Sequence, residues 1–461
     1  MRHRTTYSRA ASLALIALLL GMTASFSLPA DPVPDLQSDE KPLHTVASMG
    51  YFHGSDSGSI YTNTTLTVAG SSTCAVAQDG SLRCWGSNTW GQTGLWPFEN
   101  NPTFSPSWLV QYHAPDSTWN QTWSEVEGYN QHYCAITDDK DLYCWGMGRE
   151  GQLGAGDTNW ENTEPRKAIF PANRETIQVA PGTVHTCSIS PIRNSTPDHQ
   201  SVYCWGNNNE GQLGTAGGPD TYNPTRALLP QGSVPVGIAS SWQHTCATLS
   251  NGTGLCWGNN SYGQLGDISL AERNAPTPVR LIPAGRSIVQ MSTGVAHTCA
   301  LLDDGSITCW GDNQRGQLGN GTTSSSWQTS SVVSLPSGKT AISIDVKYGS
   351  ACAILNDDSL VCWGSNSRGQ IDPNGGGNSY IDGDPVWTTP NAVNLPGNPS
   401  IATVSIGFDH TCAITTTSDI YCWGANNMGQ LGTGGATSIP NLLHPVNLGP
   451  SADPSNPAAP N

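Results

Sequence analysis

The residues of this chain with the plainest chemistry are fourteen cysteines, which fall in seven pairs with none left over. Nine residues separate the two thiols in six of the pairs, and the second cysteine always opens the tripeptide Cys-Trp-Gly. This spacing lacks the close pairs of a zinc knuckle. An even set of thiols favours disulfide bonds and therefore an exported protein. We predict seven bonds, each within one repeat: Cys74–Cys84, Cys134–Cys144, Cys187–Cys204, Cys246–Cys256, Cys299–Cys309, Cys352–Cys362 and Cys412–Cys422.

Histidines recur two positions before the first cysteine of five repeats, at His132, His185, His244, His297 and His410. A ring of imidazoles could bind a metal or titrate near neutral pH. A repeated residue is more simply explained by a repeated structural contact, such as an imidazole bonded to backbone. We therefore predict a structural role for these histidines and no metal.

Aromatic residues gather in the long connection between the first two repeats, over residues 95–123, with Trp90, Trp123 and Tyr129 at its borders. Exposed aromatic side chains are good anchors for proteins or sugars. The alternative is that the insert packs its aromatics onto its own fold. The candidate binding residues are Trp96, Phe98, Phe104, Trp108, Tyr112 and Trp119.

A second insert, residues 372–384, is rich in glycine and aspartate and could hold calcium through oxygen ligands. Its spacing matches no EF-hand loop. The catalytic patterns G-x-S-x-G, H-E-x-x-H and G-x-G-x-x-G do not occur. We therefore predict no catalytic residues, no metal site and no cofactor.

The elements that position these residues are short hairpins. Between Cys299 and Cys309, apolar residues flank a central Asp-Asp-Gly, which predicts two strands joined by a three-residue loop. Such a loop ends on a left-handed residue, where glycine is favoured. Glycine fills the place at Gly80, Gly252 and Gly305, whereas Lys140, Asp358 and Ser418 replace it.

The first cysteines recur every 53 to 60 residues, which indicates a repeat architecture. Each repeat has about four short strands and no helical period, and such a unit can bury both faces only by radial stacking. Within a repeat, tryptophan and cysteine are adjacent, so they should face opposite neighbours. The first repeat shows no clear outer strand. We therefore expect His444–Leu448 to pair beside the N-terminal strands and complete a shared blade that closes the ring.

The pattern His-Thr-Cys-Ala, Asp-Gly, Cys-Trp-Gly-x-Asn and Gly-Gln-Leu-Gly resembles the repeat of the regulator of chromosome condensation (RCC1) family, over about residues 60–448. The resemblance implies an all-β seven-bladed β-propeller with four short strands per blade. It also implies two contrasting roles: nucleotide exchange on a small GTPase by the nuclear founder, and inhibition of β-lactamases by a secreted relative.

The two ends of the chain lie outside this pattern. A basic start, a short apolar run and small residues predict a signal peptide at 1–27. Residues 28–58 form a linker rich in Pro, Asp, Ser and Gly, 59–448 the propeller, and 449–461 a loose tail. The formal net charge of −16 disfavours nucleic acid and anionic membranes as partners.

These observations lead to one expected function and two alternatives. We expect a secreted or cell-surface, monomeric, non-enzymatic scaffold that binds an extracellular protein or glycan and has no membrane span. The first alternative is a hydrolase or lyase of extracellular polysaccharide, which would need two close carboxylates in a cleft. The further alternative is a guanine-nucleotide exchange role by family analogy.

Overall fold

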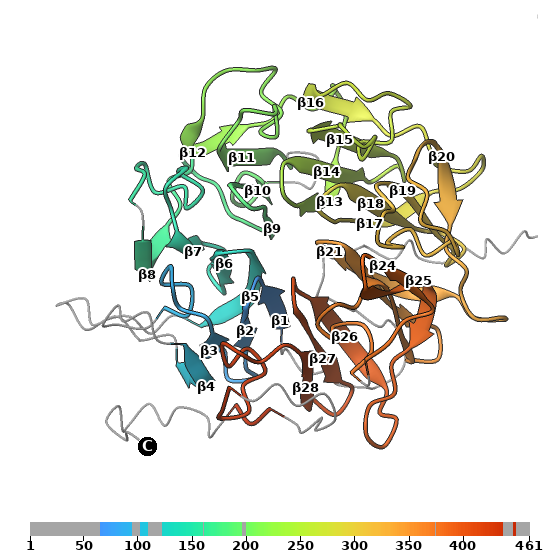
Figure 1. Ribbon diagram of the computed structural model, residues 1–461. Coiled ribbons are helices and arrows are strands. Elements are labelled where there is room, and N and C mark those ends of the chain that lie inside the picture. The colour runs from blue at the N-terminus through green and yellow to red at the C-terminus, as the bar shows by residue number, and fades with distance from the viewer. Residues whose placement is uncertain are drawn as a thin grey trace, which may run out of the picture. The chain divides into compact units, whose positions relative to one another are not determined.

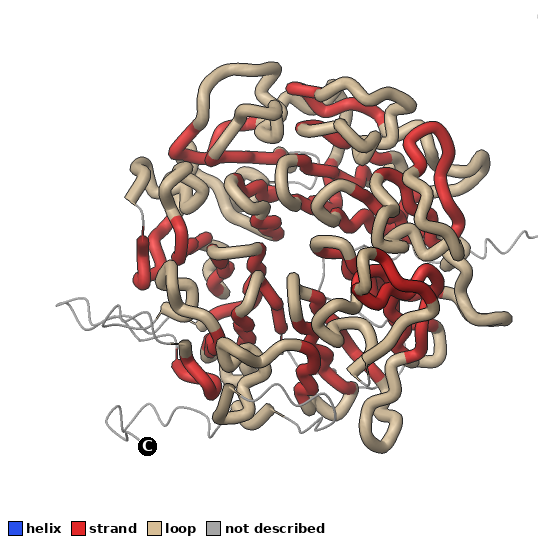
Figure 2. Tube along the Cα trace, in the orientation of Figure 1, coloured by secondary structure: helices blue, strands red, loops and turns tan. Residues whose placement is uncertain are grey.

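The computed structural model describes residues 65–94, 102–108, 122–159, 161–195, 200–373, 375–436 and 446–448. These residues form strands and turns and contain no helix (Figure 2). Seven antiparallel sheets radiate from a common axis (Figure 1), so the predicted all-β, seven-bladed propeller is confirmed. The predicted signal peptide, linker and tail lie outside the described residues.

Each blade is a meander that begins at the axis and runs outwards. The strands of blades one to three are β1 (Thr65–Ala69), β2 (Ser72–Val76), β3 (Leu82–Gly86), β4 (Thr103–Trp108); β5 (Trp123–Tyr129), β6 (His132–Thr137), β7 (Leu142–Met147), β8 (Glu161–Lys167); β9 (Gln178–Pro181), β10 (His185–Ile189), β11 (Val202–Gly206) and β12 (Thr221–Arg226). Those of blades four and five are β13 (Pro235–Ser240), β14 (His244–Leu249), β15 (Gly254–Gly258), β16 (Arg273–Pro278); β17 (Ile288–Thr293), β18 (His297–Leu302), β19 (Ile307–Gly311) and β20 (Ser326–Val332). Blades six and seven contain β21 (Ala341–Lys347), β22 (Ser350–Leu355), β23 (Leu360–Ser365), β24 (Ser379–Ile381), β25 (Asp384–Ala392); β26 (Ile401–Ile406), β27 (His410–Thr415) and β28 (Ile420–Gly424).

The predicted hairpins form with the cysteines directly opposed, as Cys299 is to Cys309, and a disulfide joins each of the seven pairs. Where a three-residue loop joins the two strands of a hairpin, it ends in a left-handed residue whether or not that residue is glycine. Gly305 has φ 76°, and Lys140, Asp358 and Ser418 have φ 65°, 62° and 71°. The register of the hairpin therefore overrides the side-chain preference at this corner.

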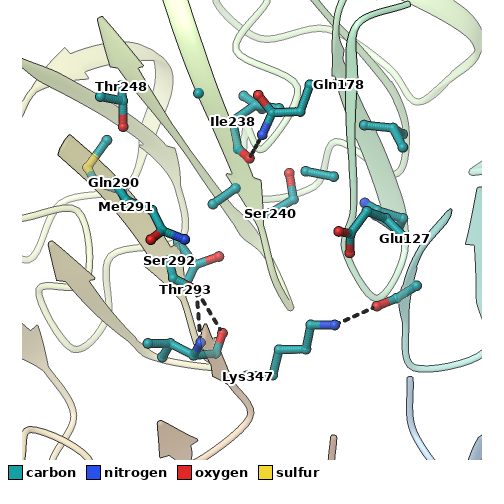
Figure 3. Close-up of a pocket in the computed structure, with 17 residues that line it drawn as sticks. Glu127, Gln178, Ile238, Ser240, Thr248, Gln290, Met291, Ser292, Thr293 and Lys347 are labelled. Carbon is teal, nitrogen blue, oxygen red and sulfur yellow. Dashed lines mark hydrogen bonds between the residues drawn. The ribbon is translucent and has the colours of Figure 1, made fainter. Parts of the chain in front are cut away.

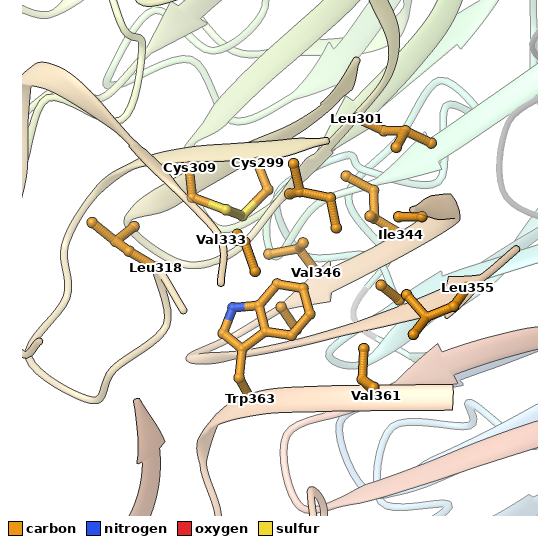
Figure 4. Close-up of a cluster of buried hydrophobic side chains, with 14 residues drawn as sticks. Cys299, Leu301, Cys309, Leu318, Val333, Ile344, Val346, Leu355, Val361 and Trp363 are labelled. Carbon is orange, nitrogen blue, oxygen red and sulfur yellow. A yellow bond between two sulfur atoms is a disulfide. The ribbon is translucent and has the colours of Figure 1, made fainter. Parts of the chain in front are cut away.

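Tryptophan and disulfide face opposite neighbours, as expected. Trp363 of blade six packs among Val346 and Val361 of its own blade and against the Cys299–Cys309 disulfide of blade five (Figure 4). The disulfide of blade six in turn packs in a cluster with Trp423 of blade seven. Seven such clusters between blades replace a single core.

The Gly-Gln-Leu-Gly turn binds the tryptophan side chain of the next blade. Its glutamine carbonyl accepts a hydrogen bond from the indole Nε1–H at 2.8–3.0 Å in every interface. The donor and acceptor pairs are Trp145–Gln92, Trp205–Gln152, Trp257–Gln212, Trp310–Gln264, Trp363–Gln317, Trp423–Gln370 and Trp85–Gln430.

The predicted mode of ring closure is wrong. Blade one has its own outer strand, β4, paired with β3. The described part of the C-terminal segment pairs with its own repeat, since the Val446 amide donates to the Ile420 carbonyl of β28 at 2.7 Å. Ala168 and Val333, which directly follow the outer strands of blades two and five, make the equivalent bond to Leu142 and Ile307. Side chains close the ring, because Val446 packs with Leu66, Val68 and Trp85 of blade one.

Candidate functional site

The histidine ring is part of the blade interfaces. The Nε2 atoms of His132, His185, His244 and His410 lie 2.7–3.1 Å from the hydroxyl of a threonine on the next blade. The partner is thus a side chain, where we expected backbone. Burial lowers the pKa of His132, His185, His244 and His297 to about 3, so these imidazoles are neutral. Among the described residues, no group of three acidic, histidine or cysteine side chains could hold a metal.

His410 has a feature that resembles a catalytic triad. Its Nδ1 lies 2.9 Å from the Asp409 carboxylate, and its Nε2 lies 2.7 Å from the Thr73 hydroxyl. All three residues are buried, and the histidine–threonine contact recurs at three other interfaces. A nucleophile must reach its substrate, so this arrangement is explained by blade packing.

A charged cluster lies on the propeller axis. Lys347 Nζ donates to the Val68 and Gly128 carbonyls at 3.0 and 3.1 Å, and also to the hydroxyls of Thr67 and Ser405. The lysine belongs to blade six, and its acceptors belong to blades one, two and seven. Figure 3 shows its side chain extended towards the blade that carries Glu127, beside a cavity of about 50 Å³.

The carboxyl groups of this cluster are shifted towards their neutral forms. Burial raises the pKa of Glu127 to about 8, although the charge of Lys347 opposes the shift. Burial raises the pKa of Asp345 as well, and Lys347 again opposes it. Burial and then repulsion from Glu127 hold the pKa of Glu125 well above its ordinary value. The enclosed cluster holds blades together and offers no open cleft for a polysaccharide.

An open pocket of about 450 Å³ lies where the axis meets one end of the propeller. This end, which we call the turn face, carries the turns between the first and second strands of the blades. The pocket, which we call the mouth pocket, is lined by Gly70, Ser71, Ser87, Thr89, Trp90, Gln92, Asn130, Gln131, Tyr348 and Phe408. None of these ten residues is charged.

The aromatic side chains of the mouth pocket are held by packing. Tyr348 stacks on Tyr129 with ring centres 4.9 Å apart, and Phe408 meets Tyr348 edge-on at 5.3 Å. The Gly70 amide donates to the Tyr348 hydroxyl at 3.2 Å. Phe408 remains 56% exposed. Tyr348 also has φ 53°, a left-handed conformation that costs an L-residue about 1–2 kcal/mol.

Sequence reasoning missed Tyr348 and Phe408, although a signal was present. Each stands four residues before the first cysteine of its repeat, in the turn that follows the innermost strand. Trp242 has the same place in blade four and is 47% exposed. In blades one and two the place is taken by Gly70 and Asn130. Bulky aromatic residues in tight turns are unusual and mark a candidate site.

The predicted aromatic insert is only partly described. Trp96, Phe98, Tyr112 and Trp119 lie outside the described residues, and so do most of residues 95–123. Phe104 and Trp108 belong to β4, so part of the expected insert is the outer strand of blade one. At the borders, Trp90 lines the mouth pocket, whereas Trp123 packs against Tyr143 and Trp145 in the interior. The six predicted binding residues stay a prediction.

The second insert forms a hairpin of β24 and β25 on blade six. Arg315 lies 4.0 Å from the Asp382 carboxylate and 3.5 Å from that of Asp384. The side-chain carboxamide of Asn366 donates to the Gly376 carbonyl. A cationic partner therefore faces two of the oxygen ligands that calcium would have used.

The fold and the mouth pocket define the class: a closed β-propeller of the repeat type with an uncharged opening at one end. The chain belongs to the RCC1-like domain family, whose model matches residues 53–346, and RCC1 repeats match residues 341–370 and 401–430. In the described part of the chain, no helix is long and apolar enough to cross a membrane.

Relatives extend the comparison. The ultraviolet-B receptor UVR8 of Arabidopsis thaliana is 31% identical over 255 residues, which is 55% of this chain and 54% of the receptor. This chain therefore spans about half of the receptor. The guanine nucleotide exchange factor SRM1 of Saccharomyces cerevisiae is 26% identical over 66% of this chain and 68% of its own. The crystal structure of Prp20p from the same yeast superposes with a TM-score of 0.66 at 20% identity, covering 84% of this chain and 88% of that one.

Proposed function

We propose that this protein is a secreted or cell-surface binding scaffold that holds a protein or glycan partner at its turn face. The observation that carries the proposal is the mouth pocket, an open site on a rigid ring whose lining includes the exposed Phe408 and the half-buried Trp90 and Tyr348. Relatives support a binding role, since yeast Prp20p binds Gsp1p and histones. Seven disulfides and the pattern of residues 1–27 support export.

A non-enzymatic role fits the mouth pocket better than polysaccharide cleavage. Glycoside hydrolysis commonly uses two carboxyl groups that flank the substrate. The ten lining residues contribute none. Asp409, which contacts the lining residue Ser71, is buried, and so are Glu127 and Asp345 on the axis. An exchange role like that of SRM1 would require the propeller to meet an intracellular GTPase, and the seven disulfides argue against that compartment.

The test is partner capture followed by comparison of two variants. The purified chain is immobilised, exposed to culture medium and cell-envelope extract, and its partner is identified and then purified. The triple variant Trp90→Ala, Phe408→Ala, Trp242→Ala should lose about tenfold or more in affinity for that partner. Tyr380→Ala removes an aromatic ring that is 63% exposed on the blade-six hairpin and is the matched control. Equal binding by the triple variant and the control would refute the turn face as the binding surface.

A further inference from the structure

The chemistry of the mouth pocket restricts the class of ligand. Its lining combines three aromatic side chains with hydroxyl and carboxamide groups and contributes no formal charge. The chain carries a net charge of −16, which repels anions at long range. A cationic group entering the pocket would meet no carboxylate on its lining. Asp409, an acid in contact with the lining residue Ser71, already receives hydrogen bonds from Ser71, His410 and Gln430. The lining therefore suits a neutral ligand.

Some polar side chains of the pocket already form hydrogen bonds within the protein, and others are available to a ligand. Gln92 accepts from the Trp90 backbone amide and donates to Ser87, so it fixes the loop that presents Trp90. In contrast, the side-chain carboxamides of Asn130 and Gln131 make no hydrogen bond to another described residue. Each can donate and accept at once, as a hydroxyl-rich ligand requires.

The aromatic part offers a flat surface beside these groups. Phe408 is 56% exposed, although Tyr348 supports its ring, and Tyr348 is itself stacked on Tyr129. Tyr348 takes a left-handed turn position that glycine or asparagine fills in blades one and two. Exposed, prearranged rings lose little conformational freedom when an apolar ring face packs on them.

We propose that the mouth pocket binds one sugar ring of a neutral oligosaccharide. The apolar face of the sugar packs on Phe408 and Trp90, and its hydroxyls exchange hydrogen bonds with Asn130 and Gln131. The pocket of about 450 Å³ falls within the size range of small-molecule sites and leaves the rest of the glycan chain in solvent. This inference rests on the proposed binding function and names the ligand class for the same site.

The experiment uses a panel of neutral tetrasaccharides, namely cellotetraose, xylotetraose, mannotetraose, maltotetraose and chitotetraose, with tetragalacturonate as the anionic comparison. Binding to the whole chain is followed by calorimetry and tryptophan fluorescence up to about 10 mM ligand, where weak single-site binding remains detectable. We expect at least one neutral sugar to bind, and tetragalacturonate to bind more weakly.

Four variants locate the binding. Phe408→Ala and Gln131→Ala should each lower the affinity for the sugar by about tenfold. The first removes the stacking surface, and the second removes a side chain that both donates and accepts hydrogen bonds. Tyr348→Gly relieves the backbone strain of the left-handed turn, so this variant should fold. It should still bind the sugar less tightly, because the Phe408 ring loses its support. Tyr380→Ala removes an exposed aromatic ring from the blade-six hairpin, outside the pocket lining, and should bind like the wild type.

Three outcomes would overturn the inference: no neutral sugar binds, only tetragalacturonate binds, or Phe408→Ala and Gln131→Ala bind as tightly as Tyr380→Ala. Melting temperatures recorded in parallel show that each variant is folded. Failure of the sugar panel together with continued capture of a protein partner by the turn face would refute the glycan and keep the scaffold function. Loss of both would refute both.

Discussion

Single residues decide how neighbouring blades meet at the axis. In four blades one residue of the innermost strand pairs with the first cysteine, and its side chain accepts a hydrogen bond from a backbone amide of the next blade. Ser405 accepts in this way from Val68, and Asp345 accepts from Ile406. Blade two has Glu127 in this place, and the corresponding residue of blade three is Pro181, which has no amide hydrogen. Glu127 therefore accepts from the Thr67 hydroxyl of blade one and lies within the field of Lys347. One proline thus explains a buried carboxyl group on the axis.

This carboxyl group should make the protein less stable as pH rises from about 4.5 to about 8. Because burial raises the pKa of Glu127 to about 8 in the folded state, the folded protein retains a proton that the unfolded chain releases near its ordinary value. Its contribution is complete at acidic pH and declines as pH rises towards 8, at up to about 1 kcal/mol per pH unit. The neutral histidines act in the opposite sense below about pH 6.5. We expect Glu127→Gln to flatten the decline between about pH 4.5 and 8, measured as melting temperature from pH 5 to 9.

The control for this prediction is Glu164→Gln, which removes an exposed glutamate of the same blade. Its curve should run parallel to that of the wild type. A Glu127→Gln curve that is also parallel to the wild type over the whole range would contradict the assignment.

At the scale of the elements, sequence and structure agree because hairpin geometry is local. The spacing of each cysteine pair and the position of Gly305 were enough to predict two strands, a three-residue loop and the disulfide. Lys140, Asp358 and Ser418 adopt the same left-handed φ, so register dominates over residue preference here. The expected pairing of the C-terminal segment with blade one was wrong for a different reason. The outer strand of blade one, Thr103–Trp108, lies inside an unusually long connection, which hid it although its Pro106 takes the same register position as Pro224 in β12 and Pro276 in β16.

One interface lacks a contact that four others have. His297 of blade five faces Ala351 of blade six, where His132, His185, His244 and His410 face the hydroxyl of a threonine. Both ring nitrogens of His297 are buried and make no hydrogen bond to a described residue. We expect Ala351→Thr to supply the missing hydroxyl and to raise the free energy of unfolding by about 1 kcal/mol.

The matched control is Ala351→Val, which has nearly the same shape and no hydroxyl group. If valine and threonine change the urea midpoint equally, the effect is one of volume and the hydrogen-bond account is refuted.

At the scale of the whole molecule, ring closure creates sites that no single repeat contains. The mouth pocket takes Trp90 and Ser71 from blade one, Asn130 from blade two, Tyr348 from blade six and Phe408 from blade seven. The repeat pattern predicted the propeller, but it could not show which turns meet at its mouth. That arrangement depends on the lengths and angles of all seven blades. The signal within reach was the repeated position four residues before the first cysteine.

Closure itself depends on the last described residues. Val446 is 7% exposed and packs between Ile420 of blade seven and Leu66, Val68 and Trp85 of blade one. The indole of Trp85 also donates to the Gln430 carbonyl at 2.9 Å, and His410 contacts Thr73 at 2.7 Å. The join between blades seven and one therefore repeats the contacts of the other interfaces, provided that the C-terminal segment is present.

Truncation after Gly432 should weaken this join, whereas truncation after Pro450 should have little effect. The shorter chain loses Val446 from the core and leaves β28 as an unpaired edge, at a cost of about 2–5 kcal/mol. Melting temperature and urea midpoint measure the loss. Hydrogen exchange then identifies which strand is affected. We expect the amides of β28, Ile420–Gly424, to lose protection before those of β1, Thr65–Ala69, because the segment pairs with β28. Earlier loss in β1 would favour the shared blade, and equal melting temperatures for the two truncations would show that the C-terminal segment plays no part in closure.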